Sequence, residues 1–88
     1  MQEVSVIIPN FNGKSYLEGV LTSLEHQSVN NFEVILVDNG SSDGSCEYVS
    51  RVFPWVRLIR LSENFGFCRA VNEGIKTSDS PYVLLLNN

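Results

Sequence analysis

Short polar side chains recur directly after four apolar runs of this sequence, and their types suggest hydrogen-bonding chemistry. In chain order they are Asn10, Asn12, Asp38, Asn39, Asn64, Asn87 and Asn88. An asparagine side chain offers a donor and an acceptor, whereas an aspartate offers only acceptors. This mixture suits recognition of a base edge and of ribose hydroxyls. It suits gripping a phosphate by charge less well, because none of these groups is a cation.

Each of these residues also has a purely structural explanation. Asparagine is a common turn residue after a strand, and Asp38 can close an Asx-turn before the next helix. Asp43 is better explained as the cap of that helix. Phe11 either stacks on a base or covers its own turn, and Arg69 either reaches a diphosphate or is solvated. The sequence leaves these alternatives open.

The hydrophobic pattern predicts the elements that position these residues. Apolar runs indicate strands at residues 4–8, 32–37, 56–61 and 82–86, and apolar stripes indicate helices at 16–26, 45–53 and 67–76. The alternation predicts an α/β fold of order β-α-β-α-β-α-β, a three-layer, Rossmann-like open parallel sheet with right-handed crossovers. In such a sheet, ligands bind outside the carboxyl ends of the strands, where the polar residues fall.

Several local expectations accompany this pattern. Pro9 is expected to end the first strand, since proline cannot donate to a ladder. Ser15 and Glu18 match a capping box at the start of the first helix. The third helix is expected to turn Phe67, Val71, Gly74 and Ile75 inward, and the last strand, 82–86, is expected to be buried. A chain that stops just beyond a core strand is expected to be part of a longer protein.

Composition narrows the class of protein. The 88 residues are 43% hydrophobic and 18% charged, which is ordinary for one soluble domain. A net charge of −4 argues against a nucleic-acid partner, and no apolar run approaches the roughly 20 residues of a membrane span. Cys46 and Cys68 are too few for a disulfide framework. They are expected to be small buried hydrophobes in a reducing compartment.

Several well-marked catalytic motifs are missing from the sequence. There is no G-x-G-x-x-G after the first strand and no G-x-x-x-x-G-K-[ST], so a dinucleotide fingerprint and a P-loop are both excluded. No H-E-x-x-H motif or cysteine cluster supports zinc. The single histidine and the isolated serines give no nucleophile triad. The polar strand ends therefore remain the best candidate site.

Four segments of the sequence resemble family 2 glycosyltransferases, in the order and spacing of that family. They are VSVIIPNFN at 4–12, VDNGSSDGS at 37–45, ENFGFCRAVNEG at 63–74 and YVLLLNN at 82–88. The resemblance covers essentially the whole chain. The Asp-Asn-Gly-Ser turn together with Asn-Phe-Gly-Phe is most similar to the rhamnosyltransferase-like branch. The resemblance implies a GT-A fold, of which this chain would be the N-terminal, nucleotide-binding part.

The resemblance also implies roles for individual residues. The residues after the first strand would line the base and ribose pocket, Asp38 would accept hydrogen bonds from the base, and the third-helix entrance would form the wall near ribose and diphosphate. Many relatives have a second acid where this chain has Asn39, which leaves the choice between uracil and thymine open. The implied donor nucleotide-binding residues are Pro9, Asn10, Phe11, Asn12, Asp38, Asn39, Gly40, Asn64, Gly66, Arg69 and Asn72.

Family members bind a divalent metal through an Asp-x-Asp-type motif after the fourth strand. Here the motif would begin with Asn87 and Asn88, and its acidic third position would follow the last residue of this chain. The resemblance implies Mg²⁺ or Mn²⁺ in the full-length enzyme, acting as a Lewis acid on the diphosphate. It implies no firmly bound metal in these residues. Residues 1–88 are thus expected to be truncated before the metal-binding acid and to be inactive alone.

The implied activity of the full-length protein is transfer of a sugar, with inversion, from a UDP- or dTDP-sugar to a glycan or lipid-linked acceptor. The expected setting is polysaccharide or cell-surface glycan synthesis in the cytoplasm or at the inner membrane face, with any attachment through regions outside this chain. A non-catalytic nucleotide-binding module and a sugar-phosphate nucleotidyltransferase are the alternatives. A flavodoxin-like module is more remote, because the first strand is not followed by an acidic cluster.

Overall fold

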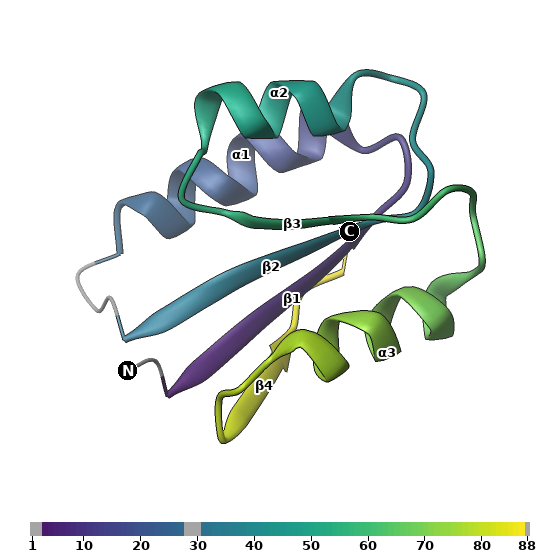
Figure 1. Cartoon of the computed structure of the whole chain (residues 1–88). Coiled ribbons are helices and arrows are strands. Elements are labelled where there is room, and N and C mark those ends of the chain that lie inside the picture. Colours follow the sequence, from purple (N-terminus) through teal and green to yellow (C-terminus); the bar gives the residue numbers. More distant parts are fainter. Residues whose placement is uncertain (1–2, 28–30, 88) are drawn as a thin grey trace.

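The computed structural model describes residues 3–27 and 31–87. Four strands, β1 (Val4–Asn10), β2 (Phe32–Asp38), β3 (Arg57–Arg60) and β4 (Tyr82–Leu85), alternate with helices α1 (Lys14–Glu25), α2 (Ser45–Val52) and α3 (Phe67–Thr77). All strand pairs are parallel, and the strand order is β3-β2-β1-β4 (Figure 1). The predicted order of elements and the parallel sheet are confirmed.

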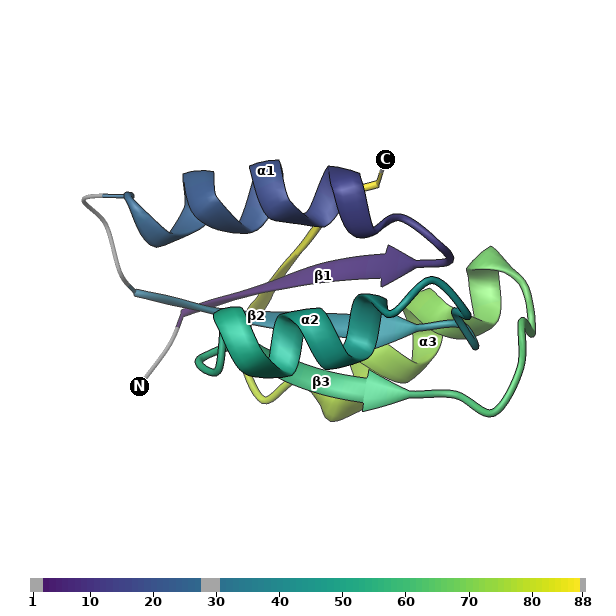
Figure 2. The ribbon, with the colours of Figure 1, turned by 90° about the horizontal axis from the view of Figure 1, so that it is seen from above.

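The helices form the two outer layers of the predicted three. Helices α1 and α2 lie on one face of the sheet and α3 lies on the other (Figures 1 and 2). Because successive side chains of a strand point to opposite faces, Val6 and Ile8 pack beneath α1 and α2 while Ile7 packs against α3. Both central strands are thus covered on both faces, which explains their nearly continuous apolar sequence.

Helix α3 approaches the sheet closely at Gly74. A Cβ atom at this position would lie 2.6 Å from Cγ2 of Ile7 and 3.2 Å from a methyl carbon of Val37. A residue without a side chain is therefore required for α3 to reach the sheet. Near the amino ends of β1 and β2, the Ser5 hydroxyl joins neighbouring segments. Its Oγ lies 3.0 Å from Oε2 of Glu33 and 2.9 Å from Oγ of Ser80.

Two expectations about element ends are wrong. Strand β1 continues through Pro9 to Asn10, pairing Pro9 with Val37 of β2. The N–H that proline lacks would face the β4 side, because Asn10 C=O, one residue on, accepts the Asn39 N–H on the β2 side. On the β4 side the ladder ends at Ile7, so no partner is deprived of a hydrogen bond.

The expected capping box is also wrong, because α1 begins at Lys14 and includes Ser15. The cap comes instead from Asp43, 29 residues further along the chain. Its carboxylate accepts the Lys14 N–H at 3.1 Å and the Ser45 N–H at 3.0 Å, and so serves the first turns of both α1 and α2. Partial burial tends to raise the pKa of the Asp43 carboxyl, but the hydrogen bonds from Ser45 and Lys14 outweigh it and lower the pKa.

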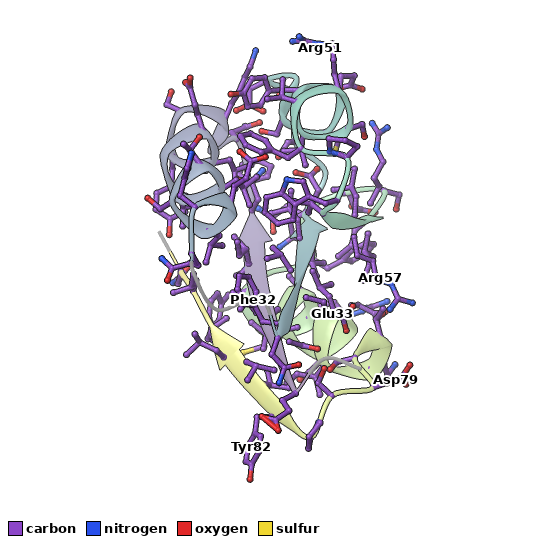
Figure 3. The ribbon with its side chains drawn as sticks, turned by 90° about the vertical axis from the view of Figure 1, so that its left-hand side faces the viewer. Phe32, Glu33, Arg51, Arg57, Asp79 and Tyr82 are labelled. Atoms are coloured by element: carbon purple, nitrogen blue, oxygen red, sulfur yellow. The ribbon has the colours of Figure 1, made fainter. Side chains whose placement is uncertain are left out.

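The side of the molecule around β4 is less buried than the sequence predicted. Strand β4 is the edge of the sheet and all four of its residues are exposed, Tyr82 most of all, whose ring points away from the sheet (Figure 3). On α3, Phe67 and Ile75 are exposed, and Ala70 and Gly74 are the buried residues. Cys46 is buried as expected, but Cys68 is exposed.

Candidate functional site

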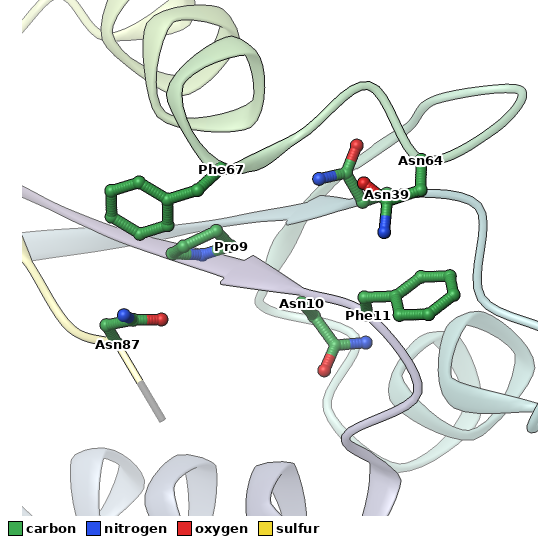
Figure 4. A pocket seen from close by; sticks show the side chains of 7 residues that line it. All are labelled: Pro9, Asn10, Phe11, Asn39, Asn64, Phe67 and Asn87. Atoms are coloured by element: carbon green, nitrogen blue, oxygen red, sulfur yellow. The ribbon is translucent and has the colours of Figure 1, made fainter.

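A cavity of about 200 Å³ lies at the carboxyl ends of the strands (Figure 4). In the sheet, β2 lies on one side of β1 and β4 lies on the other, so the strand order reverses direction at β1. The cavity lies at this reversal. Crevices at this reversal are the usual ligand sites of open α/β sheets. The cavity is lined by Pro9, Asn10, Phe11, Asn39, Asn64, Phe67 and Asn87.

The cavity unites residues from all four strand ends, as the sequence predicted. Five of its seven lining residues belong to the implied nucleotide-binding set, and Asn87 is the first position of the implied metal motif. Phe67 was missed, because its apolar side chain was assigned to the inward face of α3. Its position directly after the loop glycine Gly66 was the available signal, since the first turn of a helix at this edge faces the site.

None of the seven lining side chains is charged. Four of them are carboxamides and two are phenyl rings; the phenyl rings of Phe11 and Phe67 are 49% and 46% exposed respectively. Carboxamides can both donate and accept hydrogen bonds, and phenyl rings offer faces on which a flat heterocycle can stack. The lining therefore matches a neutral, planar, polar-edged ligand better than a multiply charged one.

A second hollow of about 380 Å³ lies beside the first, between the segments that follow β2 and β3. It is lined by Asp38, Gly40, Ser41, Arg60, Leu61 and Ser62. Asp38 and Gly40 of the implied set therefore face this hollow, whereas Asn39 between them faces the first. The Arg60 guanidinium is paired with the Glu47 carboxylate, with the two groups 3.2 Å apart.

Asp38 is committed to contacts within the protein. It is only 2% exposed, and its Oδ1 accepts hydrogen bonds from Nδ2 of Asn10 at 2.9 Å and from Oγ of Ser41 at 2.7 Å. Its Oδ2 accepts the Ser41 N–H at 2.8 Å. Asp38 therefore stabilises the turn that follows it, as the structural alternative foresaw, but through the N–H three residues on and not the N–H two residues on that defines an Asx-turn. Burial raises the pKa of the nearby Cys46 thiol to about 12, and the Asp38 carboxylate contributes to that rise.

Ser41 is a second residue that the sequence reasoning missed. Besides Asp38, its hydroxyl contacts Nδ2 of Asn10 at 3.3 Å and accepts the Asn12 N–H at 2.8 Å. Asn12 adopts a left-handed conformation, with φ of 53°, and its Oδ1 accepts the Ser42 N–H at 2.8 Å. The segments after β1 and β2 are thus joined to each other. A serine three residues after an aspartate was the available signal, because that spacing recurs in side-chain-stabilised turns.

Asn39 joins the segment after β2 to the loop between β3 and α3. Its Oδ1 accepts the Phe65 N–H at 3.1 Å, and its Nδ2 donates to the Gly66 carbonyl at 3.0 Å. Within the loop, Oδ1 of Asn64 accepts the Gly66 N–H at 2.8 Å. Gly66, with φ of 93°, occupies a conformation that favours glycine and leads directly into α3.

The structure does not place four members of the implied set against the two hollows. Asn12 and Gly66 instead shape the loops, and Asn72 is exposed on α3. The Arg69 guanidinium lies 4.8 Å from the centre of the Phe65 ring and pairs with the Glu73 carboxylate at 3.3 Å. The geometry therefore gives Arg69 a contact with the loop that leads into α3.

Comparison with known proteins decides the family. The family model described as Glycosyl transferase family 2 matches residues 5–88. The chain belongs to glycosyl transferase family 2. TuaG of Bacillus subtilis (strain 168), assigned as a glycosyltransferase of teichuronic acid biosynthesis, is 31% identical over 97% of this chain and 35% of its own length. The first curated relatives are spanned over only 13% to 36% of their lengths.

Solved structures agree with this family 2 assignment and with the GT-A fold. S. aureus TarS 1-349 in complex with UDP-GlcNAc superimposes with a TM-score of 0.88 at 28% identity, over 99% of this chain and 26% of that one. The mannosyltransferase PcManGT from Pyrobaculum calidifontis, in complex with GDP-Man and Mn²⁺, gives 0.84 at 26% identity, over 97% and 27%. The described elements are therefore one part of a larger fold in these neighbours.

The described residues of this family 2 chain do not by themselves fit a metal site. Within 3–27 and 31–87, no group of three or more His, Cys, Asp or Glu side chains could hold an ion. Asn87 lines the cavity, whereas Asn88 lies outside the described residues. In the same part of the chain, no helix has the length and apolar character needed to cross a membrane.

Proposed function

We propose that this chain forms the nucleoside-binding part of the donor site of a glycosyltransferase. The full-length protein would transfer a sugar from a nucleoside diphosphate sugar to an acceptor hydroxyl. The observation that carries the proposal is the cavity at the reversal of strand order, lined by amides and phenyl rings from all four strand ends. The nucleotide-sugar complexes of TarS and PcManGT support this choice of ligand.

The lining of the cavity indicates which part of the donor it receives. A base can stack on Phe11 while its edge and the ribose hydroxyls meet the carboxamides, and this requires no cation. The diphosphate would extend toward Asn87 at the end of β4. We propose a uracil or thymine nucleotide, as the resemblance of the sequence to family 2 glycosyltransferases implies. The UDP-GlcNAc complex of TarS supports uracil. The GDP-Man complex of PcManGT makes guanine the alternative base that an experiment should test.

The remaining chemistry is assigned to the rest of the full-length protein. It would supply the acidic metal ligand for Mg²⁺ or Mn²⁺ and the carboxylate that deprotonates the acceptor, with inversion at the sugar. The Mn²⁺ complex of PcManGT supports a divalent metal, and the assignment of TuaG to teichuronic acid biosynthesis supports a cell-surface glycan as product. We propose a cytoplasmic location, with a glycan or lipid-linked acceptor and any attachment to the inner membrane face through other regions.

Calorimetric titration with UDP, dTDP and GDP, with and without Mn²⁺, tests this function. The 88-residue chain and the full-length protein are titrated in parallel, after circular dichroism has shown that each is folded. We expect UDP or dTDP to bind the chain weakly and without metal dependence, and the full-length protein more tightly with Mn²⁺. Absence of binding by the folded full-length protein would overturn the proposal. Preference for GDP would overturn the choice of base.

Phe11→Ala locates the ligand. The ring is 49% exposed, so its removal should leave the fold intact while it takes away the stacking face. We expect a loss of about 1–3 kcal/mol in nucleotide binding, the usual contribution of a base–aromatic contact. Ser50→Ala, an exposed change on α2, is the control and should bind as the unmodified chain does. Equal affinities for the two variants would place the base elsewhere.

A further inference from the structure

The side chain of Asn39 is held at both of its polar atoms by the loop between β3 and α3. It is only 5% exposed, with the Phe65 N–H donating to its Oδ1 and its Nδ2 donating to the Gly66 carbonyl. The two partners are backbone groups of consecutive residues. The carboxamide thus closes a bridge from the end of β2 to residues 65 and 66.

The bridge requires an amide. One atom must accept a hydrogen bond and the other must donate one, and among side chains of this size and shape only asparagine has both. An aspartate could still accept the Phe65 N–H, but it would place a second acceptor against the Gly66 carbonyl oxygen. An alanine would leave both backbone groups without this partner. The identity of residue 39 therefore decides whether this bridge forms.

A second contact between the same two segments depends on the next residue. Gly40 has φ of 80°, and a Cβ atom there would lie 2.6 Å from Cα and 2.8 Å from the carbonyl carbon of Glu63. The backbone at the end of β2 therefore touches the backbone of the loop. Asn39 and Gly40 together fix residues 63–66 against β2.

The loop held in this way carries one wall of the cavity. Asn64 lines the cavity from within the loop, and Phe67 lines it from the first position of α3, directly after Gly66 (Figure 4). The facing wall consists of Pro9, Asn10 and Phe11 at the end of β1. The bridge therefore holds the wall that contains Asn64 and Phe67 to the end of β2.

We propose that Asn39 is a positioning residue for the nucleotide site, in which its amide sets the width of the cavity by holding the loop between β3 and α3. This rests on the proposed function, since it assigns the cavity to the nucleoside. In this role the Asn39 amide acts on the loop and does not contact the base. It therefore differs from an acid that would recognise the base directly from this position. This role predicts that exchanging the amide for an acid weakens nucleotide binding.

Asn39→Asp is the decisive variant, because it exchanges one NH₂ for an oxygen and leaves the shape unchanged. At pH 7.5 we expect the dissociation constant for the bound nucleotide, UDP or dTDP, to rise about tenfold in the full-length protein and in the 88-residue chain. As the pH falls to about 4 and below, the ordinary range of an aspartate pKa, the introduced carboxyl becomes protonated and can donate to Gly66 again, so the affinity should approach that of the unmodified protein. Circular dichroism of the variant at both pH values shows whether it stays folded, which separates a change in affinity from unfolding.

Matched controls separate the bridge from general acidity. Asn31→Asp makes the same chemical change at an exposed residue directly before β2, and its binding should follow the unmodified protein at every pH. The pH dependence of nucleotide binding by the unmodified protein gives the contribution of the other charged and titratable groups on the neighbouring elements. These groups are Asp38, Cys46, Arg60, Glu63 and Arg69.

Hydrogen exchange of the Phe65 amide reports the bridge without any ligand. We expect this N–H to exchange at least tenfold faster in Asn39→Asp at pH 7.5, relative to the same chain carrying Asn31→Asp. Unchanged exchange together with unchanged affinity overturns the positioning role. Faster exchange with a pH-independent loss of affinity also overturns it, and points to direct contact of residue 39 with the base. Faster exchange in a protein that binds no nucleotide would retain the bridge and reject the proposed function.

Discussion

The two sides of the cavity are built differently. On the side formed by the ends of β1, β2 and β3, Asp38, Asn39 and Ser41 connect every loop to its neighbour through side-chain hydrogen bonds. On the side formed by β4 and the start of α3, Phe67 and Asn87 are exposed, and Asn87 forms no side-chain hydrogen bond with the described residues. The connected side is complete within this chain, whereas the exposed side presents apolar surface.

The position of each strand in the sheet explains this difference. Strand β1 pairs on both sides and β2 pairs on both sides, so their ends are held rigidly and their loops are close enough to exchange hydrogen bonds. Strand β4 pairs only with β1 and lies at an edge. Strand β3 lies at the other edge, but the loop that follows it is hydrogen-bonded to Asn39. The connected side would therefore hold the proposed nucleoside in a fixed geometry, because little ordering would remain to be done when the ligand binds.

Removing the Asp38 carboxylate should break the connected side most severely. In Asp38→Ala the buried Nδ2 of Asn10 and the partly buried N–H of Ser41 lose this acceptor, and an unsatisfied buried donor costs about 1–3 kcal/mol. We expect the free energy of unfolding to fall by about 3 kcal/mol and nucleotide binding to be lost. Urea titration and calorimetry measure the two effects. Asp79→Ala, an exposed aspartate after α3, should change stability by less than about 0.5 kcal/mol.

The contact between the β2 and β3 loops can be tested at Gly40. Gly40→Ala puts a side chain on a positive φ and within 2.6 Å of the Glu63 backbone, so we expect a loss of about 2 kcal/mol in unfolding free energy. Gly19→Ala is the matched control. Nothing lies within 4 Å of that position inside α1, so alanine should stabilise the chain by about 0.5–1 kcal/mol. Equal effects of the two changes would contradict the close loop contact.

The connected and exposed sides also differ in how well the sequence predicted them. Periodicity predicted every strand and helix, because a single sequence displays the apolar runs of the strands and the apolar stripes of the helices, even for β4, whose residues are exposed. It also predicted that Asn10, Phe11, Asn39 and Asn64 would meet at one edge, since parallel strands end together. The implied role of Asp38 in contacting the base remains a prediction, although the structure shows its oxygens bonded within the protein.

The sequence did not predict structural features that depend on contacts between distant segments of the chain. Asp43 caps α1 from 29 residues away, which no local capping pattern can reveal. An apolar run such as Tyr82–Leu85 reads the same at an edge as in the centre of a sheet, so its exposure could not be foreseen. An apolar residue such as Phe67 is equally compatible with a buried and with an exposed face of α3. The structure shows that Ala70 and Gly74 form the buried face, on which Phe67 does not lie.

The buried Cys46 and the exposed Cys68 allow a comparison of how stability depends on pH. Burial, with a contribution from Asp38, raises the pKa of the Cys46 thiol to about 12, from an ordinary value of 9.0. Between these values the unfolded chain has released the proton and the folded chain retains it, so stability falls as pH rises. We expect a loss of about 1 kcal/mol or more from pH 9 to 12, measured by urea titration. Cys46→Ala should remove that part of the slope, and Cys68→Ala, at an exposed thiol, should retain it.

A substitution on the exposed side should have the smallest effect on the chain. The Tyr82 side chain lies at the sheet edge and is 67% exposed, so little apolar contact is lost in Tyr82→Ser. We expect the free energy of unfolding of the 88-residue chain to change by less than about 0.5 kcal/mol, as for other surface positions. A loss above about 1.5 kcal/mol would mean that β4 is covered in solution, for example by a second copy pairing along the edge. Sedimentation of the chain at several concentrations would then identify that pairing, because only self-association makes the loss depend on concentration.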